Sequence, residues 1–302
     1  MKPSSQSRLN ATGLLCAFGA YGLWGLFPPF FGALQPATAP EIMAHRIIWT
    51  FVFMAAVIAV RGVGEVLAIR PRTWLLLVCA SALISCNWLL YVYAVNSGHV
   101  VDTAFGYFVN PLVSVFLGVV LFGERLNRAQ SLALSIALAA VIVLSLDLHG
   151  RPLIALGLAV SFALYGAVKK VVPTDPRVSV GVEAALATPF AAAYLIWLHI
   201  GGHAQFLNHG PAHAVLLLLC GPVTAIPLLL FAAATHRLPL VTIGLIQYLT
   251  PSMLMAWGVL IGHEEMPPAR WLGFGLIWTA LAIFSFDALS RGYRSRTRVP
   301  AG

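Results

Sequence analysis

Ten apolar runs follow one another along the chain, and each is bounded by glycine, proline or a charged residue. A helix needs about 20 mostly apolar residues to cross a bilayer, and these runs are close to that length. The pattern therefore predicts an all-α fold with ten transmembrane helices. The predicted spans are residues 11–31, 42–60, 73–95, 100–122, 129–147, 153–170, 178–199, 213–235, 239–262 and 269–289.

The composition supports a membrane protein. Apolar residues make up 60% of the 302-residue chain, charged residues make up 9%, and the mean hydropathy is +0.88. A soluble domain has about 45–50% apolar and about 25% charged residues, so this chain has too few charges to cover a surface in water. The lipid bilayer is its expected surrounding. The net charge of +8 is assigned to the loops and not to nucleic-acid binding.

The basic residues predict how the chain is oriented. With the N-terminus inside, fifteen of the 18 Lys and Arg residues fall in inner segments, and only Arg151 and Arg270 fall in outer ones. Cytoplasmic loops retain such an excess, so both termini are expected in the cytoplasm. The remaining basic residue is Arg46, which lies near the outer end of the second span.

The chain also matches itself at a shift of 140 residues. The stretch FVNPLVSVFLGVVLFGERL (108–126) lies over YLTPSMLMAWGVLIGHEEM (248–266), which pairs Pro111 with Pro251 and Glu124 with Glu264. This predicts two repeats of five spans, residues 1–150 and 151–302. Because five is odd, equivalent helices run in opposite directions, and inverted repeats of this kind are typical of secondary transporters.

Three features carry a family resemblance: HRIIWTFVFM (45–54), the stretch from Asn87 to Glu124, and within it GYFVNPL followed by GERL. The chain resembles RarD proteins of the EamA branch of the drug/metabolite transporter superfamily. The resemblance implies a ten-helix carrier of the bacterial inner membrane that exports a small molecule. RarD proteins are described as linked to chloramphenicol sensitivity, and related members export amino acids and other small metabolites.

Arg46 is the first candidate site residue. Intramembrane ions usually face a cavity or a partner, and a guanidinium suits an anion or a carboxylate. His45 and Trp49 share one helix face with Glu41, and Arg46 lies beside them, so Arg46, His45 and Trp49 are assigned to the substrate pathway. The alternative is that the long side chain of Arg46 snorkels to the membrane edge.

A polar and aromatic cluster is expected near the midplane. Amides need partners in hydrocarbon, and prolines free a backbone carbonyl, which is tolerated beside a cavity. Interhelical hydrogen bonds and ordinary packing are the alternative. The predicted binding residues are Asn87, Trp88, Tyr91, Tyr107, Asn110, Gln247 and Tyr248, with Pro111 and Pro251 as helix breaks or gating points.

Glu183 lies near the inner end of the seventh span. Desolvation favours the protonated form of a buried carboxyl group, so Glu183 is a candidate for coupling transport to protons. Alternatively, it forms an ion pair with Lys169 or Lys170 at the inner surface.

The predicted function is a secondary exporter of a neutral, zwitterionic or amphipathic small molecule. The sequence contains no G-x-x-x-x-G-K-[ST] motif, so ATP-driven transport by this chain alone is excluded. The alternative is a flippase for a lipid-linked metabolite, for which Lys169 and Lys170 would form a basic entrance. Charged residues are too scattered for an enzyme, and no metal or cofactor is expected.

Overall fold

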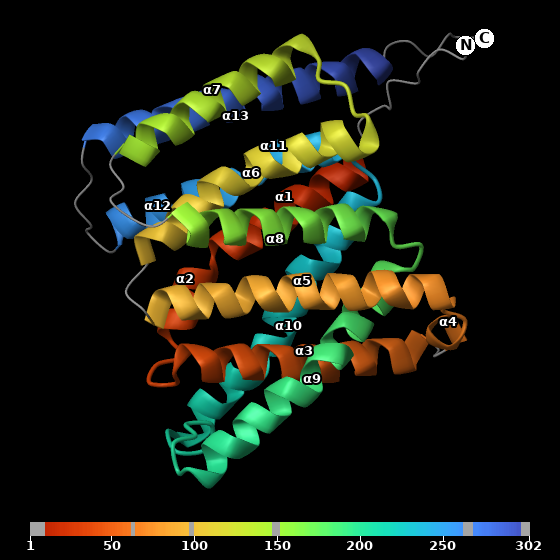
Figure 1. The fold of residues 1–302 in the computed structure, drawn as a ribbon, viewed down its shortest axis with the longest axis vertical. Coiled ribbons are helices and arrows are strands. Elements are labelled where there is room, and N and C mark those ends of the chain that lie inside the picture. Colours follow the sequence, from red (N-terminus) through yellow and green to blue (C-terminus); the bar gives the residue numbers. More distant parts are fainter. Residues whose placement is uncertain (1–9, 62–63, 97–99, 147–151, 262–267, 297–302) are drawn as a thin grey trace.

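The computed structural model describes residues 10–61, 64–96, 100–146, 152–261 and 268–296, and the regular elements in these ranges are all helices (Figure 1). They are α1 (Ala11–Gly25), α2 (Phe27–Gly32), α3 (Ala39–Arg61), α4 (Gly64–Leu67), α5 (Pro71–Asn96), α6 (Val100–Phe122), α7 (Arg128–Leu146), α8 (Pro152–Val171), α9 (Pro176–Ile200), α10 (Gly210–Thr235), α11 (Leu240–Ile246), α12 (Leu249–Leu260) and α13 (Pro268–Arg296).

Each of the ten apolar runs coincides with helix in the structure. Seven helices in the described residues are long and apolar enough to cross a membrane, and three more apolar helices are shorter. Large apolar side chains such as Leu15, Phe116 and Phe190 are exposed on the outside of the bundle, where lipid can cover them. The chain is therefore an all-helical, multi-pass membrane protein.

Two of the runs are broken helices. The first divides at Leu26 into α1 and α2, because Pro28 and Pro29 have no N–H to continue the hydrogen bonds of α1. The ninth divides at Gln247 and Tyr248 into α11 and α12, one turn before Pro251. By contrast, α6 continues through Pro111 without a break.

Several helices that are distant in sequence pack side by side. The largest contacts join α6 to α8, α7 to α13, and α3 to α9. Figure 1 shows α7 and α13 as a layer along one end of the bundle, with α3 and α9 at the opposite end. The functional site is formed by helices between these two layers together with α3.

The half-helix α11 is held against α6 by glycine contacts and by a carboxylate. A Cβ at Gly244 would lie 2.9 Å from the carbonyl oxygen of Pro111, so only glycine permits this approach. Glu124 accepts hydrogen bonds from the backbone N–H groups of Leu240 and Val241, both at 2.8 Å. These N–H groups have no partner within a helix, so Glu124 caps α11 and fixes the position of Gln247 at its other end.

Candidate functional site

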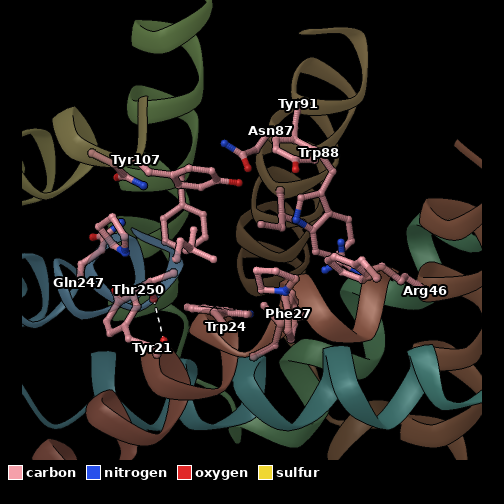
Figure 2. Close-up of a pocket in the computed structure, with 18 residues that line it drawn as sticks. Tyr21, Trp24, Phe27, Arg46, Asn87, Trp88, Tyr91, Tyr107, Gln247 and Thr250 are labelled. Atoms are coloured by element: carbon pink, nitrogen blue, oxygen red, sulfur yellow. Dashed lines mark hydrogen bonds between the residues drawn. The ribbon is translucent and has the colours of Figure 1, made fainter. Parts of the chain in front are cut away.

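A cavity of about 330 Å³ lies among the middle helices, and we call it the central cavity (Figure 2). Its lining comes from α1, α2, α3, α5, α6, α8, α10 and the α11–α12 break, so it gathers both halves of the chain. The volume lies near the small end of the range for small-molecule sites. Eight predicted site residues line it: Arg46, Asn87, Trp88, Tyr91, Tyr107, Asn110, Gln247 and Pro251.

Arg46 lies on one wall of the cavity, and its side chain is only 8% exposed. Three aromatic rings surround the guanidinium: its Cζ lies 4.8 Å from the ring centre of Trp88, 5.2 Å from Phe31 and 5.5 Å from Phe27. Rings at these distances attract a cation through their negative faces. Arg46 therefore points into the protein and does not snorkel.

The hydrogen bonds of Arg46 use neutral acceptors. Its Nε donates to Thr224 Oγ1 at 3.0 Å and its Nη1 donates to Met43 Sδ at 3.2 Å. The three salt bridges among the described side chains all involve other basic residues. Arg46 thus keeps its positive charge without a carboxylate partner in the part of the chain that the structure describes.

The opposite side of the cavity is polar but neutral, with Tyr107 and Gln247 facing Arg46 across the space in Figure 2. Asn87 is fixed, because its Nδ2 donates to Leu158 O and Ser161 Oγ, both at 2.9 Å. Asn110 differs: its Oδ1 is buried and has no hydrogen-bond partner among the described residues. Asn110 is thus a cavity-lining residue with an unsatisfied acceptor.

Besides Glu183, four predicted residues do not line the cavity. Trp49 Nε1 donates to His45 Nδ1 at 3.1 Å, and the His45 ring stacks on Phe206 with the ring centres 4.9 Å apart. His45 and Trp49 therefore support the loop before α10. Tyr248 is buried at the α11–α12 break, and Pro111 lies within α6, next to Gly244.

Sequence reasoning missed the aromatic residues of α1 and α2. Tyr21, Trp24, Phe27 and Phe31 all line the cavity. Trp24 also contacts Phe231, with ring centres 5.7 Å apart. The resemblance of AYGLWG (20–25) to LYGAVK (164–169) pairs Tyr21 with Tyr165 and could have signalled only Tyr21.

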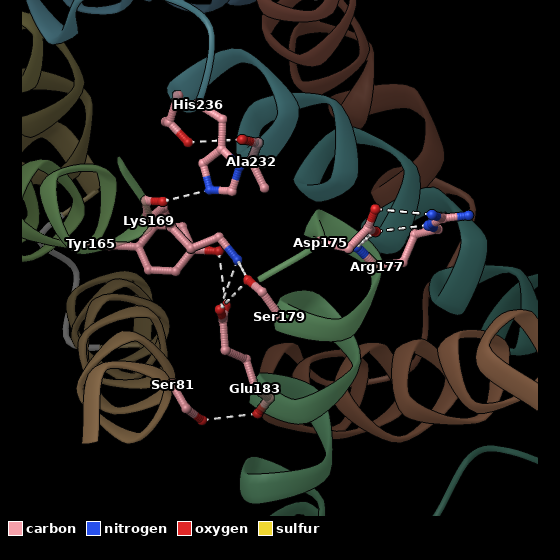
Figure 3. A network of polar contacts seen from close by, with 10 residues as sticks. Ser81, Tyr165, Lys169, Asp175, Arg177, Ser179, Glu183, Ala232 and His236 are labelled. Carbon is pink, nitrogen blue, oxygen red and sulfur yellow. Dashed lines mark hydrogen bonds and ion pairs between the residues drawn. The ribbon is translucent and has the colours of Figure 1, made fainter. Parts of the chain in front are cut away.

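Glu183, the coupling candidate, lies in a separate buried network (Figure 3). Lys169 Nζ lies 2.7 Å from Glu183 Oε1, and the two side chains are 0% and 5% exposed. Tyr165 and Ser179 each donate a hydrogen bond to the carboxylate at 3.0 Å, and Lys169 also contacts Ser179. Both oxygens of Glu183 are thus occupied, and the residue is not part of the cavity wall.

Aromatic side chains connect this network to the cavity. The Tyr165 ring stacks on Phe231 with the ring centres 5.8 Å apart, and Phe231 contacts the cavity-lining residues Tyr21, Trp24 and Phe162. Phe231 and Tyr165 therefore pack between the lining of the cavity and the buried ion pair.

The loop next to the network holds an exposed ion pair. Asp175 caps α9 by accepting a hydrogen bond from the Arg177 N–H at 2.9 Å, and it also pairs with the Arg177 side chain at 2.7 Å. The hydrogen bond from the guanidinium lowers the pKa of Asp175 below its ordinary value. The carboxylate therefore stays charged at neutral pH and fixes the start of α9.

A multi-pass helical bundle with a central, mostly apolar cavity and a few polar groups has the architecture of a small-molecule transporter. Two stretches, residues 11–146 and 152–286, match the EamA-like transporter family. The chain belongs to this family, which contains transporters and not enzymes. Two matches in one chain support a duplicated repeat.

Individual relatives agree with this assignment and confirm the resemblance to RarD. Protein RarD of Streptomyces exfoliatus is 45% identical over 100% of this chain and 96% of its own length. Protein RarD of Salmonella typhimurium is 40% identical over 92% of this chain and 95% of its own. A crystal structure with 18% identity superposes with a TM-score of 0.72 over 93% of this chain and 99% of that one, which supports the fold alone.

Proposed function

We propose that this protein is a secondary transporter that exports a small metabolite or drug-like molecule across the bacterial inner membrane by alternating access. The central cavity is its binding site. The observation that carries the proposal is Arg46, a buried cation that faces the cavity without a carboxylate partner in the described residues. An intramembrane ion in this position marks a substrate pathway.

The proposal includes the finer architecture. Ten spans form two inverted five-helix repeats, residues 1–150 and 151–302, with both termini in the cytoplasm. Helix at all ten apolar runs, two matches to one family model and the excess of Lys and Arg in alternate loops support this arrangement. The site then lies where the two repeats meet.

The coupling ion is proposed to be the proton, and the contacts of Glu183 bear on where it binds. The carboxylate is already paired with Lys169 at 2.7 Å, which favours the structural alternative for this residue. A Glu183→Gln variant that still accumulates substrate against its gradient would remove Glu183 from the coupling mechanism.

The flippase alternative requires a basic entrance for a phosphate-bearing lipid. Both candidate lysines are already paired: Lys169 with Glu183, and Lys170 with Glu124 at 3.2 Å. Their charges are therefore neutralised within the protein, and the exporter is the better supported function.

The test is uptake of labelled compounds into inside-out vesicles with and without a proton gradient. Aromatic amino acids, branched amino acids and a phenicol are the compounds. We expect gradient-dependent uptake that is lost in Arg46→Ala. Arg237→Ala should retain it, since Arg237 is an exposed cation outside the cavity lining. Normal uptake by the Arg46→Ala protein would contradict the role of Arg46.

A further inference from the structure

The charges around the central cavity are unbalanced, and this defines the substrate class. Arg46 contributes a positive charge, and no Asp or Glu is among the described residues that line the cavity. The other buried cation, Lys169, has its own carboxylate. The cavity therefore has a site for a negative group and, in its described lining, none for a positive group.

The guanidinium of Arg46 retains donors for a ligand. It has five N–H groups, and the described hydrogen bonds involve one at Nε and one at Nη1. The surrounding rings of Phe27, Phe31 and Trp88 stabilise the cation without neutralising it. A carboxylate can accept two parallel hydrogen bonds from such a group, and these are among the strongest that proteins form.

The rest of the lining suits a neutral, mostly apolar body. Trp24, Trp88 and Phe162 supply apolar and aromatic surface. Asn110 Oδ1 is buried, has no partner in the described residues, and lies in a residue that lines the cavity. An unpaired buried acceptor costs free energy until a donor reaches it, so it favours a substrate with a hydroxyl or amide N–H.

We propose that the central cavity selects a monoanionic organic acid, with its carboxylate on Arg46, its apolar body against the aromatic walls and a neutral hydrogen-bond donor toward Asn110. Zwitterions and cations bind more weakly, because an ammonium group would lose its hydration and find no carboxylate. This differs from the neutral or zwitterionic substrate that the sequence led us to expect. The inference rests on the central cavity being the transport site.

The test uses four compounds that share a 4-hydroxyphenylpropyl skeleton, whose hydroxyl is the neutral donor, and differ in charge: 3-(4-hydroxyphenyl)propionate, its amide, tyrosine and 3-(4-hydroxyphenyl)propylamine. Binding to the purified full chain in detergent is measured by titration calorimetry. We expect the acid to bind more than about tenfold tighter than the amide or the zwitterion, as expected when a built polar partner is left unpaired. Equal binding of the amide or the zwitterion, or no binding of the acid, overturns the proposal.

Variants then assign the preference to one residue. Arg46→Gln should reduce binding of the acid to the level of the amide and leave the amide unchanged, whereas Arg46→Lys should retain part of the preference. Arg237→Gln is the matched control, since it removes an exposed cation from outside the cavity lining. A preference for the acid that survives in Arg46→Gln overturns the proposal. The comparison of the four compounds in the unmodified protein is an independent test, because it needs no variant.

The result is separable from that of the uptake assay. Preference for the acid without uptake of any compound, the labelled acid included, would overturn the exporter and leave the ligand class standing. Gradient-driven uptake of a phenicol or an amino acid, with no preference for the acid, would leave the exporter standing and overturn the ligand class.

Discussion

Arg46 and Lys169 are the most deeply buried Arg and Lys residues in the described part of the chain, and their surroundings differ. Lys169 has a carboxylate at 2.7 Å and contacts Ser179 in the same network. Arg46 is surrounded by aromatic rings and bonds to a hydroxyl and a thioether. Lys169 is therefore satisfied within the protein, whereas Arg46 lacks a described carboxylate and is proposed to bind one on the substrate.

The largest effect on stability is expected at Lys169. Lys169→Met leaves the Glu183 carboxylate buried without its cation, and breaking one side of a buried pair costs about 3–5 kcal/mol. Thermal unfolding in detergent should show a large drop in the midpoint.

The double variant Lys169→Met/Glu183→Leu is the matched control, since apolar replacement of a whole buried pair is often neutral. It should recover most of the lost stability. A single variant as stable as the unmodified protein would show that the pair is not structural.

Arg46→Met is expected to preserve stability and abolish transport. No described carboxylate loses a partner, and a membrane-embedded Arg itself costs about 2.5–3.5 kcal/mol on insertion scales. The unfolding midpoint should therefore stay unchanged or rise, while uptake in vesicles falls to background. A fall in the midpoint as large as that of Lys169→Met would make Arg46 a structural residue and remove the contrast between the two.

Much of the fold could be predicted from the sequence, because hydropathy acts over whole segments. Each of the ten apolar runs is helical, and the resemblance to RarD is confirmed by the relatives. Pro28 and Pro29 account for the break at Leu26, whereas Pro111 suggested a break that α6 does not have. A proline removes one hydrogen bond, and the neighbouring packing decides whether the helix continues.

The site was harder to predict, because it depends on the rotation of each helix. His45 and Arg46 are adjacent, but successive residues of a helix differ by about 100° in direction, so one packs on Phe206 and the other faces the cavity. The Lys169–Glu183 pair spans the turn between α8 and α9, and sequence offered Lys170 as an equal partner. Lys170 instead forms an ion pair with Glu124.

The same contrast recurs, with smaller expected effects, between two amides of the cavity wall. Asn87 donates to Leu158 O and Ser161 Oγ on α8, whereas Asn110 Oδ1 has no partner in the described residues. Asn87→Leu removes two buried hydrogen bonds between α5 and α8 and should lower stability by about 1–3 kcal/mol. Asn110→Leu removes an orphan acceptor and should leave stability unchanged.

For ligand binding, the larger effect is expected from Asn110→Leu, the variant with the smaller effect on stability. Asn110→Leu should weaken a substrate that carries a hydroxyl or amide donor and spare a matched analogue without one, because the lost oxygen serves only the ligand. Thermal unfolding and calorimetry on the same preparations measure both effects. If Asn110→Leu destabilises the protein as much as Asn87→Leu and leaves binding unchanged, both amides are structural. The contrast between a paired and an unpaired side chain, drawn from Lys169 and Arg46, then does not extend to neutral groups.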